Sequence, residues 1–176
     1  MSKQGQIWVE TVIYTLIGLS IIGLVISIIK PAIDEKRDKA VIDQSLEMLN
    51  SISSDIDEVR YYGTGNARQI ELKIKNGKLE IDSKNDSIIF SMDSSYKYSE
   101  LDQSVSIGKI NSTTRKKANK YEVLLRLDYK GILNLTYNEE EKLKNFQAAS
   151  LPYKITATNF GSSNITSQIN IDFSMG

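Results

Sequence analysis

The chain has 176 residues, 22 basic and 22 acidic side chains, and neither cysteine nor histidine. This length fits one compact domain with one appended element. The missing residue types exclude disulfide bonds, metal sites built from cysteine or histidine, and catalytic triads that use histidine, while the balanced charge argues against a dedicated nucleic-acid-binding protein.

The first expected element is a long apolar helix. From Gln6 to Ile29 the chain reads QIWVETVIYTLIGLSIIGLVISII, with Glu10 as its single ionisable residue. As a helix this run spans roughly 36 Å, which exceeds a hydrocarbon core of about 30 Å. The rest of the chain is too short to enclose a helix that is apolar on every side, so the run predicts membrane insertion. An ordinary secretory signal peptide does not fit, because the run is too long and Lys30 stands where a small residue would precede cleavage.

A short polar leader precedes this run. Residues 1–5 read MSKQG, and Gln6 and then Glu10 follow the glycine. This arrangement resembles the class III (prepilin-type) signal peptide of type IV pilins, in particular the archaeal ones. The resemblance covers about the first 30 residues, and it implies that a membrane peptidase cuts between Gly5 and Gln6 and leaves the apolar helix on the mature protein. Trp8 departs from the family pattern, which commonly has a small residue at that position.

Glu10 is costly inside an apolar helix, by about 2.5–3.5 kcal/mol at the middle of a membrane. One interpretation is that it lies near the headgroups and reaches water. The other follows from the resemblance: cleavage creates an amino group at Gln6, and Glu10 of a neighbouring subunit pairs with it inside an apolar filament core. Cyclisation of Gln6 would remove that positive charge.

Beyond the apolar run we expect a helical stalk. Pro31 predicts a bend in the helix and not its end. After a charged segment, apolar residues recur at helical spacing up to the breaker at 63–66, namely Ile42, Leu46, Leu49, Ile52, Ile56 and Val59. We expect this stripe to pack on the domain that follows, since it is too short for a free coiled coil.

The signals for the orientation of the helix in a membrane conflict with one another. Cations cluster on the C-terminal side of the apolar run, which by the positive-inside rule favours a cytoplasmic C-terminus. The leader and the glycosylation motifs described below favour an outward-facing domain, and we give these more weight.

From residue 69 onward the apolar period changes to two, which predicts strands. Asn76-Gly77 predicts a two-residue hairpin between the first two. Asn138 and Glu141 predict the cap of a short helix that reaches about residue 149. The expected strands are 69–75, 78–82, 87–92, 105–110, 121–129, 132–137, 153–159 and 164–173, a pattern typical of a β-sandwich.

The C-terminal region contains few chemical signals. The segment Gly63-Thr64-Gly65 lacks the βαβ context of a nucleotide-binding loop, and we interpret it as a turn. Arg115, Lys116, Lys117 and Lys120 predict a solvated hairpin loop, with contact to a glycan or a phosphate as the alternative. Four sequons for N-glycosylation are present, slightly more than composition alone would give, at Asn85, Asn111, Asn134 and Asn164.

Together these features predict an α+β fold with a leader (1–5), an apolar transmembrane or assembly helix (6–30), an amphipathic stalk (31–62) and a β-sandwich head (63–176). The resemblance implies a structural subunit of an archaeal type IV pilus-like filament, first in the cell membrane and then at the cell surface. Its implied partners are copies of itself, a prepilin-type peptidase, an assembly ATPase and a platform membrane protein, with no cofactor, metal or catalytic residue.

Two rival functions remain. One is a membrane-anchored surface β-domain that never polymerises. The other is a surface enzyme with a carboxylate pair for glycoside chemistry, which would need two carboxyl groups about 5–9.5 Å apart, and no spacing in the sequence suggests such a pair.

Overall fold

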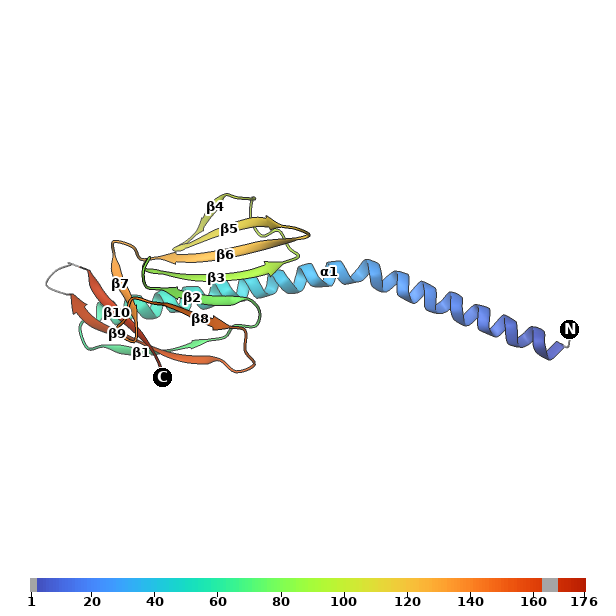
Figure 1. Cartoon of the computed structure of the whole chain (residues 1–176), viewed down its shortest axis with the longest axis horizontal. Helices are drawn as coiled ribbons and strands as arrows, with labels where there is room; N and C mark the ends of the chain where they lie inside the picture. Colours follow the sequence, from blue (N-terminus) through green and yellow to red (C-terminus); the bar gives the residue numbers. More distant parts are fainter. Residues whose placement is uncertain (1–2, 163–167) are drawn as a thin grey trace.

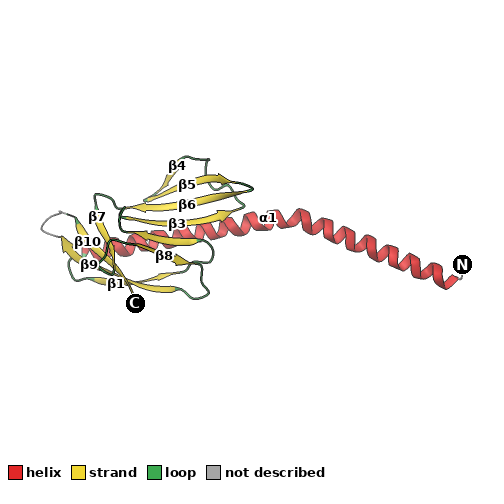
Figure 2. Ribbon diagram, in the orientation of Figure 1, coloured by secondary structure: helices red, strands yellow, loops and turns green. Residues whose placement is uncertain are grey.

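The computed structural model describes residues 3–162 and 168–176, and it confirms the predicted α+β fold. One helix leads into a domain of two β-sheets, from which the N-terminal half of the helix projects as a long rod (Figures 1 and 2). The elements are α1 (Lys3–Tyr61), β1 (Ala67–Leu72), β2 (Lys78–Asp82), β3 (Ser87–Ser94), β4 (Ser104–Ile107), β5 (Ile110–Lys117), β6 (Lys120–Asp128), β7 (Leu133–Tyr137), β8 (Leu143–Gln147), β9 (Tyr153–Ser162) and β10 (Ile169–Met175).

The strands form one smaller and one larger sheet. The smaller sheet has the order β1-β9-β10-β7, and its β10–β7 pair is parallel. The larger sheet has the order β4-β5-β6-β3-β2-β8, and all its pairs are antiparallel. The chain passes from one sheet to the other between β1 and β2 and at each step from β6 to β9, so neither sheet forms from neighbouring segments alone.

The C-terminal half of α1 forms part of the core of this head. It packs against β1, β9 and β10 of the smaller sheet and against β3, β5 and β6 of the larger one. All six residues of the predicted apolar stripe are buried, and four of them (Ile42, Leu49, Ile56 and Val59) are completely inaccessible. The stripe therefore packs as predicted, and residues 41–59 belong to the same apolar cluster as the strands.

Asn159 of β9 stabilises the end of α1. Its buried Nδ2 donates to the carbonyl of Val59 (3.1 Å), one of the carbonyls that a helix end leaves without an internal partner. Its Oδ1 accepts from the amide of Gly161 (2.7 Å), and its carbonyl accepts from that of Gly65 (2.7 Å). The segment 63–65 is the predicted turn, and both of its glycines have positive φ.

Pro31 does not end the helix. It lies inside α1, which runs through it into the head. Figure 1 shows that α1 changes direction close to the point where it leaves the head, in agreement with a bend and not a stop.

The predicted hairpin at Asn76-Gly77 is wrong. β1 pairs with β9, whereas β2 pairs with β3 and β8, so the segment between them passes from one sheet to the other. The turn itself forms, with Gly77 at a φ of 81° and its amide bonded to the Asn76 side chain (2.9 Å). Burial of Ile70 and Leu72 in the smaller sheet outweighs the local preference for a hairpin.

The predicted helix from Asn138 to residue 149 is also wrong, because this segment contains a turn and then β8. Asn138 and Glu139 both have positive φ, 51° and 61°, which no right-handed helix allows. β8 then pairs with β2 and buries Phe146 between Tyr137 (ring centroids 6.3 Å apart) and Tyr153 (5.3 Å). In this segment the packing of Phe146 against two aromatic rings outweighs the helix-capping pattern of Asn138 and Glu141.

The expected strand at 105–110 is interrupted by the turn of a hairpin, because 105–107 belong to β4 and residue 110 begins β5. β4 ends at Ile107, Gly108 has a φ of 61°, and β5 begins at Ile110. The remaining expected strands are found with shifts of a few residues at their ends, except that the expected 164–173 strand begins at Ile169 and its earlier part falls largely outside the described residues.

Gly77 is required for more than its backbone angle. A Cβ there would lie 2.4 Å from the Ser91 carbonyl oxygen and 2.7 Å from the Met92 Cβ, whereas a Cβ on Gly131, which has a similar φ, meets nothing within 4 Å. We expect Gly77→Ala to lower the free energy of unfolding by about 1–3 kcal/mol more than Gly131→Ala, because only the first overpacks the structure. Chemical denaturation of both variants measures the difference, and equal losses would contradict this contact.

The burial of α1 predicts which fragments fold. A fragment that begins at Asp34 keeps every buried helical residue and should be soluble, with a strand-rich circular dichroism spectrum. A fragment that begins at Gly63 loses seven buried apolar side chains of α1. At about 1.5–3 kcal/mol each, their loss equals or exceeds the whole stability of a typical domain. A folded, soluble 63–176 fragment would show that the helix is dispensable.

Candidate functional site

The outer part of α1 is an apolar surface without any cover. It is the one helix in the described residues that is long and apolar enough to cross a membrane, and its most apolar stretch is entirely unburied. Its large apolar side chains are 42–75% exposed, namely Ile7, Trp8, Val9, Val12, Ile13, Tyr14, Leu16, Ile17, Leu19, Ile21, Ile22, Leu24, Val25, Ile26, Ile28, Ile29 and Ile33. Soluble monomers rarely expose apolar patches beyond a few hundred Å², so this surface requires an apolar environment or partner.

The polar side chains of this segment suit such an environment. The hydroxyls of Thr11, Thr15 and Ser20 each donate to the carbonyl four residues earlier, at 2.8–2.9 Å, and Ser27 donates to Leu24 (2.7 Å). Each hydroxyl therefore satisfies its donor within the helix, and none needs water. Glu10 differs from these four residues, because it is exposed on the helix and forms no ion pair within the described part of the chain.

The predicted cleavage point lies at the start of α1. Gly5 and Gln6 have helical backbones, and Glu10 follows Gln6 by four residues, about one turn. Residues four apart lie on the same face of a helix, so Gln6 and Glu10 share one face of α1. The pairing of Glu10 with a new N-terminus stays a prediction.

Polar contacts hold α1 against the head at both ends of its buried half. Near the neck, Asp38 accepts from the backbone amide of Ser95 (2.6 Å), and the Lys39 amine lies 5.7 Å from the centre of the Tyr96 ring. Near the helix end, Lys109 forms an ion pair with Asp57. Since exposed pairs of this kind contribute roughly 0–1 kcal/mol each, the apolar contacts fix the helix and the polar ones set its position along the sheets.

Arg68 adds a further link between the sheet and the helix. Its guanidinium group bridges Asp55 (3.1 Å) and Glu58 (2.6 Å), which lie one turn apart on α1. The strand that carries Arg68, β1, is an edge strand of the smaller sheet. These pairs therefore tie one sheet edge to the same buried half of the helix.

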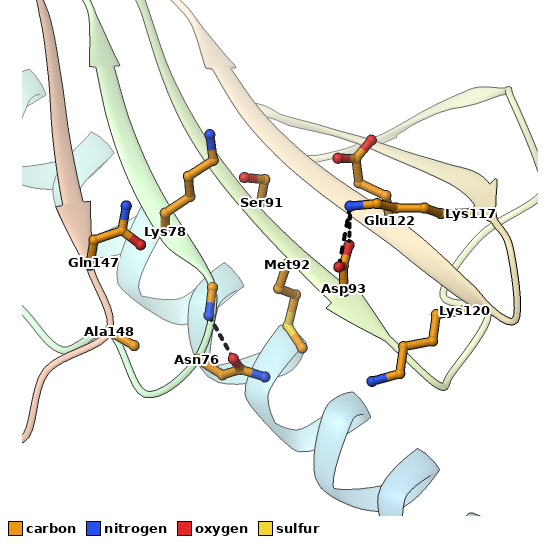
Figure 3. A pocket seen from close by; sticks show the side chains of 11 residues that line it. Asn76, Lys78, Ser91, Met92, Asp93, Lys117, Lys120, Glu122, Gln147 and Ala148 are labelled. Atoms are coloured by element: carbon orange, nitrogen blue, oxygen red, sulfur yellow. Dashed lines mark hydrogen bonds and ion pairs between the residues drawn. The ribbon is translucent and has the colours of Figure 1, made fainter.

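The basic cluster at 115–120 is exposed and lies at the tip of the β5–β6 hairpin, as predicted. It borders a shallow hollow of about 570 Å³ at the ends of β2, β3 and β6 (Figure 3). In the hollow the Lys117 amine donates to Asp93 (3.0 Å), and this hydrogen bond and charge raise the pKa of Lys117. Figure 3 shows the Lys120 amine turned away from that pair.

The candidate glycosylation asparagines differ in exposure. Asn85 is exposed in the β2–β3 turn, where its side chain donates to Asp82 (2.7 Å). Asn111 on β5 is half-buried and accepts from Ser106 (2.8 Å), and Asn134 on β7 is half-buried and bonded to Asn170. Asn164 lies outside the described residues. Geometry thus favours Asn85 as an acceptor over the two strand positions.

Within the described residues, no group of three or more acidic side chains is placed to hold a metal ion. Comparison with protein-family models, with curated proteins and with solved structures found no match to this chain. The proposal for its function therefore depends on its own residues and geometry.

Proposed function

We propose that the chain is a structural subunit of a type IV pilus-like surface filament, similar to archaeal type IV pilins. The observation that carries this proposal is that α1 is one continuous helix. Its inner half packs between the sheets of the head, and its outer half is apolar on all sides. Such a subunit is held in the cell membrane by the outer helix and later packs the same helix against copies of itself in a filament core. The same apolar surface serves both steps, because lipid and helix core are equally free of water.

The leader and Glu10 support a filament over a permanent anchor. An anchor needs only a long apolar run, and it gains nothing from a carboxylate that costs about 2.5–3.5 kcal/mol in mid-membrane. In a filament, Glu10 has a function, since it pairs with the Gln6 amino group of a neighbour after cleavage. The partners of this function are a prepilin-type peptidase, an assembly ATPase and a platform membrane protein, and the head faces outward with Asn85 as the most accessible glycan acceptor.

We predict that the leader is removed between Gly5 and Gln6 when the chain is produced with a prepilin-type peptidase. The intact mass should fall by roughly 0.5 kDa, apart from any glycans. Gly5→Val should block the cut, whereas Gly18→Val, at a helix position with open space around it, should leave it unchanged. Native protein that retains residues 1–5 would remove the cleavage step from the proposal.

We predict that Glu10→Ala cuts filament assembly while leaving leader cleavage and folding of the head intact. Removing one partner of a buried ion pair costs about 3–5 kcal/mol, so the ratio of filamentous to membrane-bound subunit should fall at least about 100-fold. Glu47→Ala, which removes an exposed carboxylate from the same helix, is the matched control and should assemble normally.

Cyclisation of Gln6 would reduce the Glu10→Ala defect to that of a neutral hydrogen bond, about 0.5–1.5 kcal/mol or up to roughly 13-fold. The mass of the N-terminal peptide distinguishes the two cases. If Glu10→Ala assembles as well as the wild type, or if no filaments form with the peptidase and assembly proteins present, the chain is a membrane-anchored surface protein.

A further inference from the structure

The buried half of α1 and the larger sheet run side by side, so positions on one can be matched to positions on the other. Lys109, just before β5, pairs with Asp57, and Ser95, just after β3, binds Asp38. These two helix positions are about 28 Å apart along the axis, and β5 from Lys109 to Lys117 covers about 26 Å. The strands therefore run nearly parallel to the helix, from the level of Asp57 towards the neck.

The β5–β6 hairpin is the part of the larger sheet that reaches furthest towards the N-terminus. Ser94 pairs with Tyr121, and Tyr121 pairs with Lys116, so Ser95 lies level with the Lys117–Lys120 end of the hairpin. The tip thus lies at or slightly beyond the level of Asp38. Figure 1 shows it on the side of the head from which the outer helix leaves.

The distance from this tip to the end of the apolar run is short. Eight residues, about 12 Å of helix, separate Asp38 from Lys30. The headgroup layer on each side of a bilayer takes up about 5–7 Å of that span. Extended lysine side chains at the tip cover much of what remains, so their amines meet the headgroups when the apolar run spans a membrane.

The tip is charged in a way that suits this position. Residues 115–120 carry four cations and no carboxylate, and they are exposed. Lys117 is held by Asp93, whereas Arg115, Lys116 and Lys120 form no ion pair within the described part of the chain. Glu122 lies across from Arg115 on the same sheet face. The neck adds Lys30, Lys36 and Arg37, opposed by Asp34 and Glu35, while Asp38 is used by the Ser95 amide.

We infer that the β5–β6 tip is a docking surface for anionic phospholipid headgroups, which holds the head against the membrane while the apolar run is inserted. This inference depends on the membrane insertion in the proposed function but not on filament assembly. The cations of the neck are then no sign that the C-terminal side is cytoplasmic. They contact the same lipid surface as the cations of the hairpin. Lys117 is paired with Asp93, so Lys116 and Lys120 make the lipid contacts.

The chain has no cysteine, so a single label is easily placed. A fluorophore on Asn119→Cys, at the tip, reports on the distance to nitroxide-labelled headgroups in nanodiscs that contain the full chain. Asn85→Cys, in the turn at the other end of the sheet, is the matched control position. We expect strong quenching at residue 119 with about one third phosphatidylglycerol, little with phosphatidylcholine alone, and little at either composition for residue 85.

Charge variants test which residues carry the contact. Lys116→Gln with Lys120→Gln should lower the ratio of docked to undocked heads about 25-fold, roughly five-fold for each lysine. Lys84→Gln with Lys130→Gln makes the same change in net charge in turns far from the tip and should have little effect. About 1 M salt, where the screening length is near 3 Å, should release the wild-type head.

Three results would overturn the inference: equal quenching in anionic and neutral nanodiscs, an unchanged Lys116/Lys120 double variant, or an equal loss in the Lys84/Lys130 control. Each leaves the proposed function intact, because the chain is still inserted. A chain that does not copurify with nanodiscs would instead contradict membrane insertion, and the docking surface with it.

Discussion

The structure depends on the packing of one helical stripe between two sheets. The side chains from Ile42 to Val59 contact both sheets, and the strands of the head close around them. At about 1.5–3 kcal/mol for each buried aliphatic side chain, this one helical face contributes as much as a small domain's net stability. The head and the helix are therefore one folding unit, and a division into stalk and head describes shape more than stability.

The two halves of the helix present different surfaces. The inner half is amphipathic and packed in protein, while the outer half is apolar on all sides, and its threonine and serine hydroxyls donate within the helix. The change occurs within the short charged segment at the neck, where Asp38 and Lys39 contact the head. A continuous helix across this boundary needs no flexible linker, so the position of the head is set by the helix itself.

Periodicity in the sequence predicted the long helix, its buried stripe and most strands, because these depend on apolar spacing over many residues. It failed where a single long-range contact decided the structure. Phe146 packs between the rings of the two neighbouring strands along the chain, and it pairs with Leu79 of β2, 67 residues earlier, so a helix-capping pattern ends in an edge strand. Asn76-Gly77 forms its turn, but which strands pair on either side depends on sheet partners far along the chain. Asn159 donates to the carbonyl of Val59, which lies 100 residues earlier. No local pattern in the sequence could therefore predict its position at the helix end.

The unbroken helix limits how the length of the neck can change in evolution. Each residue added between Lys30 and Asp38 rotates the outer half by about 100° relative to the head and lengthens the neck by about 1.5 Å. Single insertions would therefore point the head in a new direction, whereas insertions of seven residues, close to two full turns, keep its direction and raise it by about 10 Å. Related chains with longer necks should therefore differ from this one by whole helical turns, since only these lengths keep the head in the same direction.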